Sequence, residues 1–368
     1  MKKLIFGFSL FCMGIIVSSC VDKNEEVDED SMPEFLGNSV YDALKAPHDS
    51  LQGTFNTYLR LVDDMGLAET LQRTGSKTVF PANDEAFDRF FQTTTWKTGS
   101  GSFVRSYEDL SYAQKRLLVL SSQLDNAMLV KLMANVSGSS DVIRGQAMKH
   151  ATSVSVIDSV THIDKPSEYF KNNPYFKELD VEGGADFIFD NTAPMMIHFT
   201  KEFMLNHSLT TLGETSDFSV LTGQTYQEGD GYVFRNKIIR KDITCQNGYV
   251  HQVDNVIVPP GNLAQVIHQE EGNTTLFSRM LDRFALPYPQ TKTTSDYRAS
   301  AAQYGWREVP TIYEVRYMST LSHDTEEGGQ SINYYPGTTT QVNTLHKLPF
   351  DPGWNRYYLA TGQTGTGD

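Results

Sequence analysis

Cysteine is scarce in this chain of 368 residues, which has only Cys12, Cys20 and Cys245. Cys12 and Cys20 fall within the first 20 residues, which differ in composition from the rest, so the main part of the chain keeps Cys245 alone. No disulfide can therefore form within that part. A chain of this length can bury enough apolar surface to fold without one, and we expect Cys245 to be a small packed residue rather than a reactive thiol.

Basic residues are also few. The chain has 31 Lys and Arg side chains against 45 Asp and Glu, a formal net charge of −14. Residues 1–19 hold two of the lysines and no acid, so the remainder has 29 basic side chains against 45 acidic ones, a charge of −16. Nucleic acid and anionic membrane surfaces are therefore poor partners for the body of the protein, and we expect no nucleic-acid partner.

Motifs typical of enzymes and metal sites are missing. His198 and His207 are nine residues apart, and the chain has no H-E-x-x-H motif, no paired Cys and His cluster, no G-x-S-x-G turn and no phosphate or dinucleotide loop. Asp84 and Asp254 could form the carboxylate pair that acid–base catalysis requires. However, Asp84 falls in the expected first turn of a helix, where the helix dipole favours an acid for structural reasons. We expect no enzyme, no catalytic or metal-binding residue and no cofactor.

The one long apolar run lies at the N-terminus. It covers residues 4–17, follows two lysines and ends just before Cys20. A membrane span needs about 20 apolar residues. A charged start, an apolar stretch and small residues before a cleavage site are instead typical of a signal peptide, which we expect at residues 1–19.

The four residues Val17 to Cys20, Val-Ser-Ser-Cys, resemble the lipobox of bacterial lipoproteins. The resemblance implies that Cys20 carries acyl chains such as palmitate and becomes the first residue of the mature protein, which is then held at the membrane through its N-terminal lipid. Each buried CH₂ group stabilises such attachment by ~0.8 kcal/mol. The alternative is an ordinary secretory signal with a chance cysteine.

Residues 20–36 form an acidic segment with few apolar side chains; its acids are Asp22, Glu25, Glu26, Asp28, Glu29, Asp30 and Glu34. Such a segment cannot bury enough surface to offset its ordering entropy, so we expect a flexible tether. Acidity directly after the lipidated cysteine also resembles the surface-export signal of Bacteroidetes lipoproteins, which implies a surface-exposed, lipid-anchored protein of the outer membrane. Alternatively, the segment is only a solvated spacer.

The pattern beyond residue 36 changes from helices to strands. We expect a helix opened by Ser39, a longer one from about Leu51 to Gly66, a strand at 78–80, a helix capped by Asn83, and one long or two broken helices from Ser111 to about residue 132. Strands are predicted at 151–163, 185–200, 232–243 and 249–258, the last two joined by an Asn-Gly hairpin turn. Helices first and strands afterwards indicate an α+β fold.

Two separated segments resemble the signatures of fasciclin-type domains. Thr78 to Phe87, T-V-F-P-A-N-D-E-A-F, is similar to the first signature, and Asn247 to Pro260, N-G-Y-V-H-Q-V-D-N-V-I-V-P-P, to the second. The resemblance implies a fasciclin-like domain at 37–268 with a helical N-terminal part and a β-rich C-terminal part. The chain departs from the family in the order Pro81-Ala82 and in the longer spacing between signatures, which predicts an insertion at about 137–216.

The C-terminal region suggests a further unit. Residues 275–284 have apolar side chains at helical spacing and resemble the first helix of another fasciclin-like repeat, but neither signature recurs. We therefore expect an incomplete second fasciclin-like domain at 272–368.

The family resemblance implies a non-enzymatic cell-surface lipoprotein that mediates adhesion or binds an extracellular protein or glycan. In this family the His-containing strand has been linked to cell adhesion, so Tyr249, His251 and Asp254 are candidate adhesion residues. The other interpretation of His251, a half-buried histidine satisfied by a neighbour, is the more common outcome for a histidine on a strand.

Aromatic residues are concentrated in residues 272–368, where Trp306, Trp354, Tyr334 and Tyr335 are candidate glycan contacts. Flat rings with a polar edge can stack on sugars. This composition favours an alternative function, an accessory glycan-binding lipoprotein of a polysaccharide-uptake system. Packing within a core or an interface is the other explanation for these rings, and the more common one.

Overall fold

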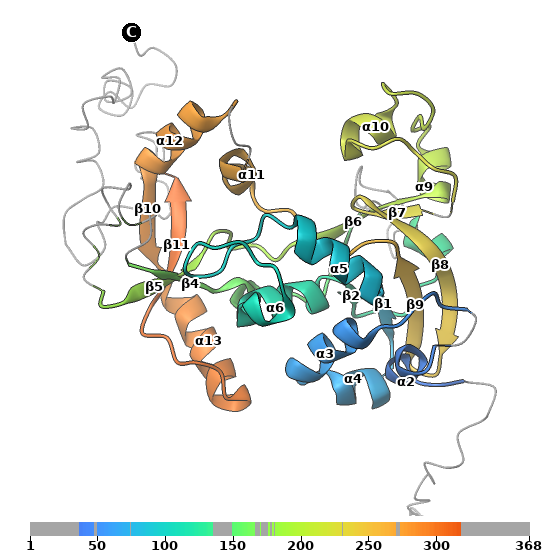
Figure 1. Ribbon diagram of the computed structural model, residues 1–368, viewed down its shortest axis with the longest axis horizontal. Helices are drawn as coiled ribbons and strands as arrows, with labels where there is room; N and C mark the ends of the chain where they lie inside the picture. Colours follow the sequence, from blue (N-terminus) through green and yellow to red (C-terminus); the bar gives the residue numbers. More distant parts are fainter. Residues whose placement is uncertain are drawn as a thin grey trace, which may run out of the picture. The chain divides into compact units, whose positions relative to one another are not determined.

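The computed structural model describes residues 37–317, apart from gaps at 48–49, 74, 135–148, 166–169, 171–175, 177–178, 180, 230 and 270–272 (Figure 1). The predicted signal peptide, Cys20, the acidic tether, Tyr334, Tyr335 and Trp354 lie outside the described residues. The described residues from Asn38 onward belong to one compact unit. Within the described ranges, no helix is long and apolar enough to span a membrane.

The larger sheet has seven strands in the order β2-β1-β9-β8-β7-β6-β3. All neighbouring pairs in it are antiparallel except β1 and β9, which are parallel. Its strands are β1 (Lys77–Val79), β2 (Gln123–Leu124), β3 (Lys149–Ala151), β6 (Met195–Thr200), β7 (Gly231–Val233), β8 (Asn236–Cys245) and β9 (Gly248–Val253).

The smaller sheet has four strands in the order β10-β11-β5-β4, namely β4 (Thr161–Asp164), β5 (Gly184–Ile188), β10 (Ala285–Pro289) and β11 (Ile312–Tyr317). Here β11 pairs in parallel with β5, and Tyr313 lies opposite Phe187. The sheet thus combines strands from the predicted insertion with strands from the predicted second domain. The expected boundary at 268–272 is therefore wrong for the described residues, because backbone hydrogen bonds join the two sides.

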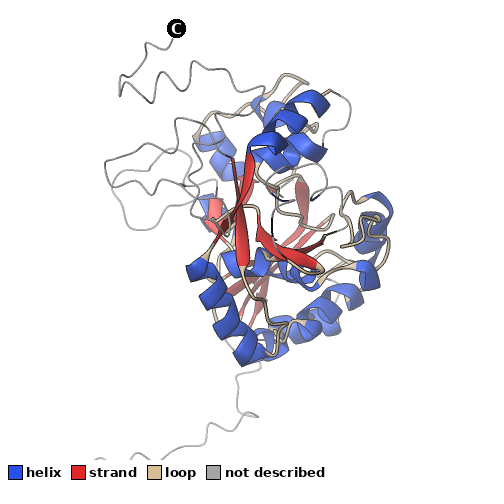
Figure 2. Cartoon of the chain, turned by 90° about the vertical axis from the view of Figure 1, so that its left-hand side faces the viewer, coloured by secondary structure: helices blue, strands red, loops and turns tan. Residues whose placement is uncertain are grey.

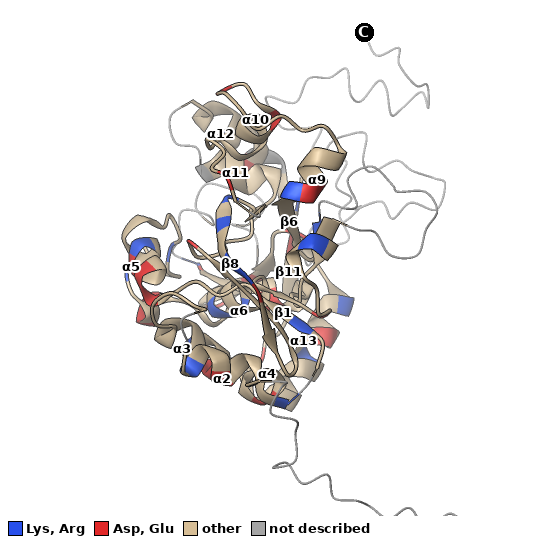
Figure 3. Ribbon diagram, turned by 90° about the vertical axis from the view of Figure 1, so that its right-hand side faces the viewer, with Lys and Arg blue, Asp and Glu red and all other residues tan. Residues whose placement is uncertain are grey.

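Helices flank the strands (Figure 2) and make the fold a mixed α+β structure, as the sequence predicts. The described α-helices are α2 (Val40–Lys45), α3 (Asn56–Asp64), α4 (Ala68–Arg73), α5 (Asp84–Thr93), α6 (Tyr112–Leu120), α9 (Lys201–Asn206), α10 (Asp217–Thr222), α11 (Leu263–Gln269), α12 (Thr275–Phe284) and α13 (Thr291–Tyr304). Acidic and basic residues are intermixed on α5 and α9 (Figure 3).

The predicted helix starts are confirmed where a polar side chain caps the helix. Ser39 accepts a hydrogen bond from the Asp42 N–H group, and Asn83 accepts one from Ala86. Ser111 and Gln114 form a complete capping box at the start of α6. Each cap satisfies N–H groups that would otherwise have no partner in the first turn.

Several predicted elements differ in extent from the observed ones. The second long helix begins at Asn56 rather than near Leu51. The helical pattern after Ser111 ends at Leu120, because Leu124 lies in β2 opposite Thr78 of β1. The predicted strand at 151–163 is interrupted by a 3₁₀ turn at Val156–Ser159, which Ser155 and Asp158 cap. Tertiary pairing and a local cap thus override the apolar pattern.

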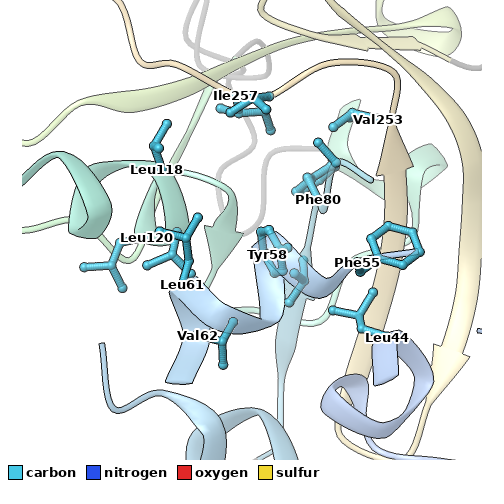
Figure 4. Close-up of a cluster of buried hydrophobic side chains, with 14 of the residues drawn as sticks. Leu44, Phe55, Tyr58, Leu61, Val62, Phe80, Leu118, Leu120, Val253 and Ile257 are labelled. Atoms are coloured by element: carbon cyan, nitrogen blue, oxygen red, sulfur yellow. The ribbon is translucent and has the colours of Figure 1, made fainter. Parts of the chain in front are cut away.

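The main hydrophobic core lies between the N-terminal helices and the larger sheet (Figure 4). Phe55, Tyr58 and Leu61 of the α3 region face Phe80 and Val253 from the strand side. Cys245 at the end of β8 belongs to this core, and burial raises the pKa of its thiol to about 11. Cys245 is thus the packed, unreactive residue that the sequence predicts.

Gly248 allows β9 to lie directly against β1. The β8–β9 hairpin turn pairs Cys245 with Gly248, and a β-carbon on Gly248 would lie 1.9 Å from the Lys77 carbonyl oxygen. The φ angle of Gly248, +152°, also favours glycine.

We expect Gly248→Ala to lower the free energy of unfolding by roughly 1–3 kcal/mol, because the methyl group must displace backbone. Urea unfolding measures this change. Gly213→Ala is the matched control, since Gly213 also has a positive φ, +90°, but has open space around the β-carbon position. Equal losses in the two variants would contradict the steric explanation.

Candidate functional site

Strand β9, which contains the candidate adhesion residues, is a central strand. It lies between β1 and β8, and its residue Tyr249 is paired with Thr78 on one side and with Thr244 on the other. Both backbone edges of the strand are therefore occupied. A partner could reach only side chains that project beyond the layers covering this sheet.

His251 does not project in this way. Its side chain is 0% exposed, its Nδ1 atom accepts a hydrogen bond from the Asp242 N–H group at 2.8 Å, and its Nε2 atom donates to the Met128 carbonyl oxygen at 2.8 Å. The ring packs 5.2 Å from that of Phe80. These contacts favour the structural interpretation of His251, with the ring fully buried rather than half-buried. A direct adhesive contact by this imidazole is excluded, because both nitrogens and both faces are enclosed.

His251 fixes an irregular part of β8. The β8–β9 register shifts between Arg240 and Ile243, and Asp242 has a left-handed backbone with φ +56°. The Asp242 carboxylate accepts a hydrogen bond from the Val130 N–H group at 2.8 Å. The bulge, the buried histidine and the loop around Met128 therefore hold one another in place.

The other two candidates also have internal roles or limited exposure. Asp254 accepts a hydrogen bond from the Lys237 N–H group at 2.8 Å, and burial raises the pKa of its carboxyl group. The Arg89 guanidinium donates to the Asp254 carbonyl oxygen at 2.6 Å. Tyr249 is half-buried. Of the three residues, Tyr249 is thus the best placed for contact with a partner.

Asp84 belongs to one helix and caps another. It lies in the first turn of α5, and its carboxylate also accepts hydrogen bonds from Thr54, from Asn56 and from the Thr57 N–H group at 2.7 Å. Helix α3 has no side-chain cap of its own. Burial alone would raise the pKa of Asp84, but the bonds from Thr54 and Thr57 outweigh it and lower the pKa. This favours the structural interpretation of Asp84 over a catalytic pair with Asp254.

Trp306 lies in an aromatic cluster that the sequence did not predict. The centroids of Tyr112, Tyr297 and Tyr304 lie 5.8, 5.4 and 5.7 Å from that of Trp306, and the Arg116 guanidinium lies 4.5 Å above its ring. The Arg116 side chain is held by Asp158 at 2.5 Å. We refer to Tyr112, Arg116, Tyr297, Tyr304 and Trp306 as the Trp306 cluster.

The Trp306 cluster combines exposed and buried rings. Tyr304 is 63% exposed and Tyr112 is 41% exposed, whereas Tyr297 is buried. Trp306 is half-buried and packs beside Val156 and Ile157, as do residues of α13. The neighbouring letters Tyr304-Gly305-Trp306 could have suggested part of this cluster. Tyr112 could not have been found, because nearly two hundred positions separate it from Trp306 and only the fold brings them together.

A pair of neighbouring histidines was also not predicted from the sequence. His150 of β3 and His198 of β6 lie 2.5 Å apart through Nδ1 and Nε2, and His198 Nδ1 is buried without a hydrogen-bond partner. Burial and the neighbouring His150 lower the pKa of His198 to about 3. Within the ranges that the structure covers, no group of three or more potential ligands could hold a metal ion.

We expect the protein to lose stability as pH falls below about 6.5, the pKa of an unfolded histidine. Burial lowers the pKa of both His198 and His251 in the folded state, so the unfolded chain binds more protons in this window. Each buried histidine contributes a slope of up to about 1.4 kcal/mol per pH unit.

Urea unfolding at pH 6.5 and pH 5.0 measures this loss while the acids with lowered pKa values are still ionised. His198→Leu should flatten the dependence, whereas His207→Leu, at an exposed position, should not. Equal unfolding free energies at the two pH values would contradict the neutral, buried state of His198 and His251. The raised pKa of Asp254 acts in the opposite direction, but its contribution is shared by both variants.

Comparison with known proteins adds no assignment. No model of a known protein family matches the chain, and no curated protein sequence matches it.

Proposed function

We propose that this protein is a fasciclin-like, non-enzymatic surface lipoprotein. It is held at the outer membrane through lipid on Cys20 and binds an extracellular protein or glycan. The observation that carries the proposal is the parallel pairing of β1 with β9, since these two strands belong to the two segments that resemble fasciclin signatures.

The two segments form one continuous unit. Thr78 lies opposite Tyr249 and Val79 opposite Val250. Beyond the end of β1, the Pro81 carbonyl oxygen accepts a hydrogen bond from the Val253 N–H group of β9 at 3.1 Å. The unusual order Pro81-Ala82 is compatible with this arrangement, because Pro81 contributes only its carbonyl group. Residues from widely separated parts of the sequence thus meet, which supports a common structural origin for the two motifs.

Exposed apolar side chains support a role in macromolecular binding. Helix α12 has the expected apolar pattern, but Leu276 is 74% exposed and Phe277 is 54% exposed, and Met280 of the same helix is also exposed. Leu263 of α11, which contacts α12, is exposed as well. Several exposed apolar side chains on two helices that contact each other are typical of interaction sites.

The test is binding of the full mature chain to arrays of extracellular-matrix proteins and glycans. We expect saturable binding to at least one ligand above that of a control domain. Leu276→Ser with Phe277→Ser should reduce it without loss of folding, since both side chains are exposed. Leu205→Ser with Leu212→Ser is the matched control on other exposed apolar residues. Absence of any ligand above the control domain would contradict the proposed function.

The Trp306 cluster supports a second candidate, an accessory glycan-binding lipoprotein. Tyr112 presents an exposed ring 5.8 Å from the Arg116 guanidinium, and Tyr304 presents an exposed ring stacked on Trp306. Such rings beside a hydrogen-bond donor can stack on sugar rings and bind their hydroxyl groups. Trp306 itself is contacted by three tyrosine rings and Arg116, so it supports the exposed rings rather than forming the main stacking face.

Affinity gels of plant and host polysaccharides test this candidate. Tyr304→Ala should abolish retention, and Tyr112→Ala should weaken it. Tyr317→Ala is the control, because Tyr317 is a tyrosine at the end of β11 and is not among the rings that contact Trp306. Unchanged retention of Tyr304→Ala would exclude the Trp306 cluster as the glycan contact.

A further inference from the structure

A cleft of about 540 Å³ lies apart from both the β9 strand and the Trp306 cluster. Its lining comes from the C-terminal end of α5, from β6, from α10, from the turn between β7 and β8, and from residues 258–266. Cavities of roughly 300–1,000 Å³ are the usual size for small-molecule sites. The cleft is therefore large enough for a small ligand.

Most of the described residues that line this cleft are apolar, and none of them is an acid. Phe90, Trp96, Phe199, Leu221 and Phe234 are among the apolar lining residues, and Thr93, Thr94, Thr95 and Thr222 supply hydroxyl groups. None of the described lining residues is Asp or Glu, although the chain as a whole has a net charge of −14. An anionic group would thus meet no carboxylate in the wall.

Arg235 is the only charged residue in the described lining. Its Nη2 atom lies 3.6 Å from the position of a β-carbon on Gly223, which places the guanidinium beside the C-terminal end of α10. Within the described part of the chain, Arg235 has no ion-pair or hydrogen-bond partner. A guanidinium prefers planar oxygen anions and can bind a carboxylate through two parallel bonds.

The turn that positions Arg235 is held in an uncommon conformation. Phe234 has a left-handed backbone with φ +51°, which is rare for a bulky residue, and its ring lines the cleft next to Arg235. Such backbone strain persists where the surrounding structure enforces it, often at binding sites. The turn thus contributes both an apolar wall and the only charged residue of the described lining.

We propose that this cleft binds an amphiphile with a single anionic end, an aliphatic monocarboxylate. The hydrocarbon chain lies among Phe90, Phe199 and Leu221, where its burial stabilises the complex, and the carboxylate pairs with Arg235. A single cation in a lining made mostly of apolar residues fits a ligand with one charge and an otherwise apolar body.

Isothermal titration calorimetry of the full mature chain with decanoate, below micelle-forming concentrations, tests this site. Decanol is the neutral comparison and decyltrimethylammonium the cationic one. We expect one saturable site that binds decanoate about tenfold more tightly than decanol, the factor that corresponds to one charge-assisted hydrogen bond at a partly exposed position. The cation should bind most weakly.

Two variants separate the polar and apolar parts of the site. Arg235→Ala should lower the affinity for decanoate about tenfold and leave that for decanol unchanged, whereas Arg240→Ala, at an exposed position of β8 outside the lining, should change neither. Leu221→Trp should lower the affinity for both decanoate and decanol, because the larger side chain fills the cleft. Leu205→Trp on α9 should leave both affinities unchanged.

Three results would overturn the proposal: no saturable binding of decanoate, equal affinity for decanoate and decanol, or an unchanged decanoate affinity in Arg235→Ala. Since Arg235 and Leu221 are exposed, their variants should fold, and thermal unfolding of each variant verifies this. The outcome does not depend on whether the protein is an adhesin.

Discussion

His251→Ala should lower the free energy of unfolding by about 3–5 kcal/mol, since a buried ring is lost and two buried backbone groups lose their partners. These groups are the Asp242 N–H group and the Met128 carbonyl, each bonded to the imidazole at 2.8 Å. The variant should also expose the loop around Met128 to hydrogen exchange, because that loop is joined to the bulge of β8 through His251 and Asp242. Urea unfolding and amide exchange provide the two measurements.

His207→Ala is the matched control for this experiment. His207 is exposed and stacks only on Phe203, so its removal should cost much less. A His251→Ala protein with unchanged stability but lost ligand binding would contradict the structural role and restore the imidazole as a contact residue. Loss of stability and of ligand binding together is expected from unfolding alone.

Asp84→Ala should lower the free energy of unfolding by about 2–4 kcal/mol, because one carboxylate caps α3 and joins it to α5. Four hydrogen bonds from Thr54, Asn56 and Thr57 end on it. Its lowered pKa means that this stabilisation is fully present above about pH 4, the pKa of an unfolded aspartate, and is lost as pH falls through the lower folded value. Thermal and urea unfolding at pH 7 measure the effect.

Asp88→Ala controls for the loss of an acid on the same helix, since Asp88 is exposed on α5. Asp84→Asn should be less damaging than Asp84→Ala, because the amide keeps one acceptor oxygen. A loss in Asp84→Ala no greater than that in Asp88→Ala would show that the Asp84 carboxylate does not cap α3. That result would reopen a different role for Asp84.

Local chemistry made much of the fold predictable. Ser39, Asn83 and Ser111 cap helices within three residues of themselves, and the Asn247-Gly248 turn closes its own hairpin. These signals depend on near neighbours in the sequence and are therefore readable without a structure. The α+β class follows from their order.

Long-range pairing was not predictable in the same way. Leu124 has a helical spacing to its neighbours, yet it pairs with Thr78 of β1. Likewise β11 joins β5 across more than one hundred residues, which no local pattern indicates. The helix at 275–284 was predicted correctly, but the exposure of Leu276 and Phe277 depends on what the rest of the fold leaves uncovered.

The candidate sites show the same division. Tyr249 and His251 are two residues apart on β9 and so share one face of the strand, and their rings stack 6.4 Å apart. Sequence spacing could not reveal that Phe80 and Met128 enclose His251. The cleft beside Arg235 draws on five separate segments, so it had no sequence signal at all.

Metabolic labelling with palmitate, combined with protease treatment of intact cells, tests the proposal that this protein is lipid-anchored and displayed at the cell surface. The native protein should incorporate the label and be degraded by added protease, and Cys20→Ala should be unlabelled and released from the membrane fraction. Label retained in Cys20→Ala, or a native protein that is unlabelled and protected on intact cells, would contradict the proposal.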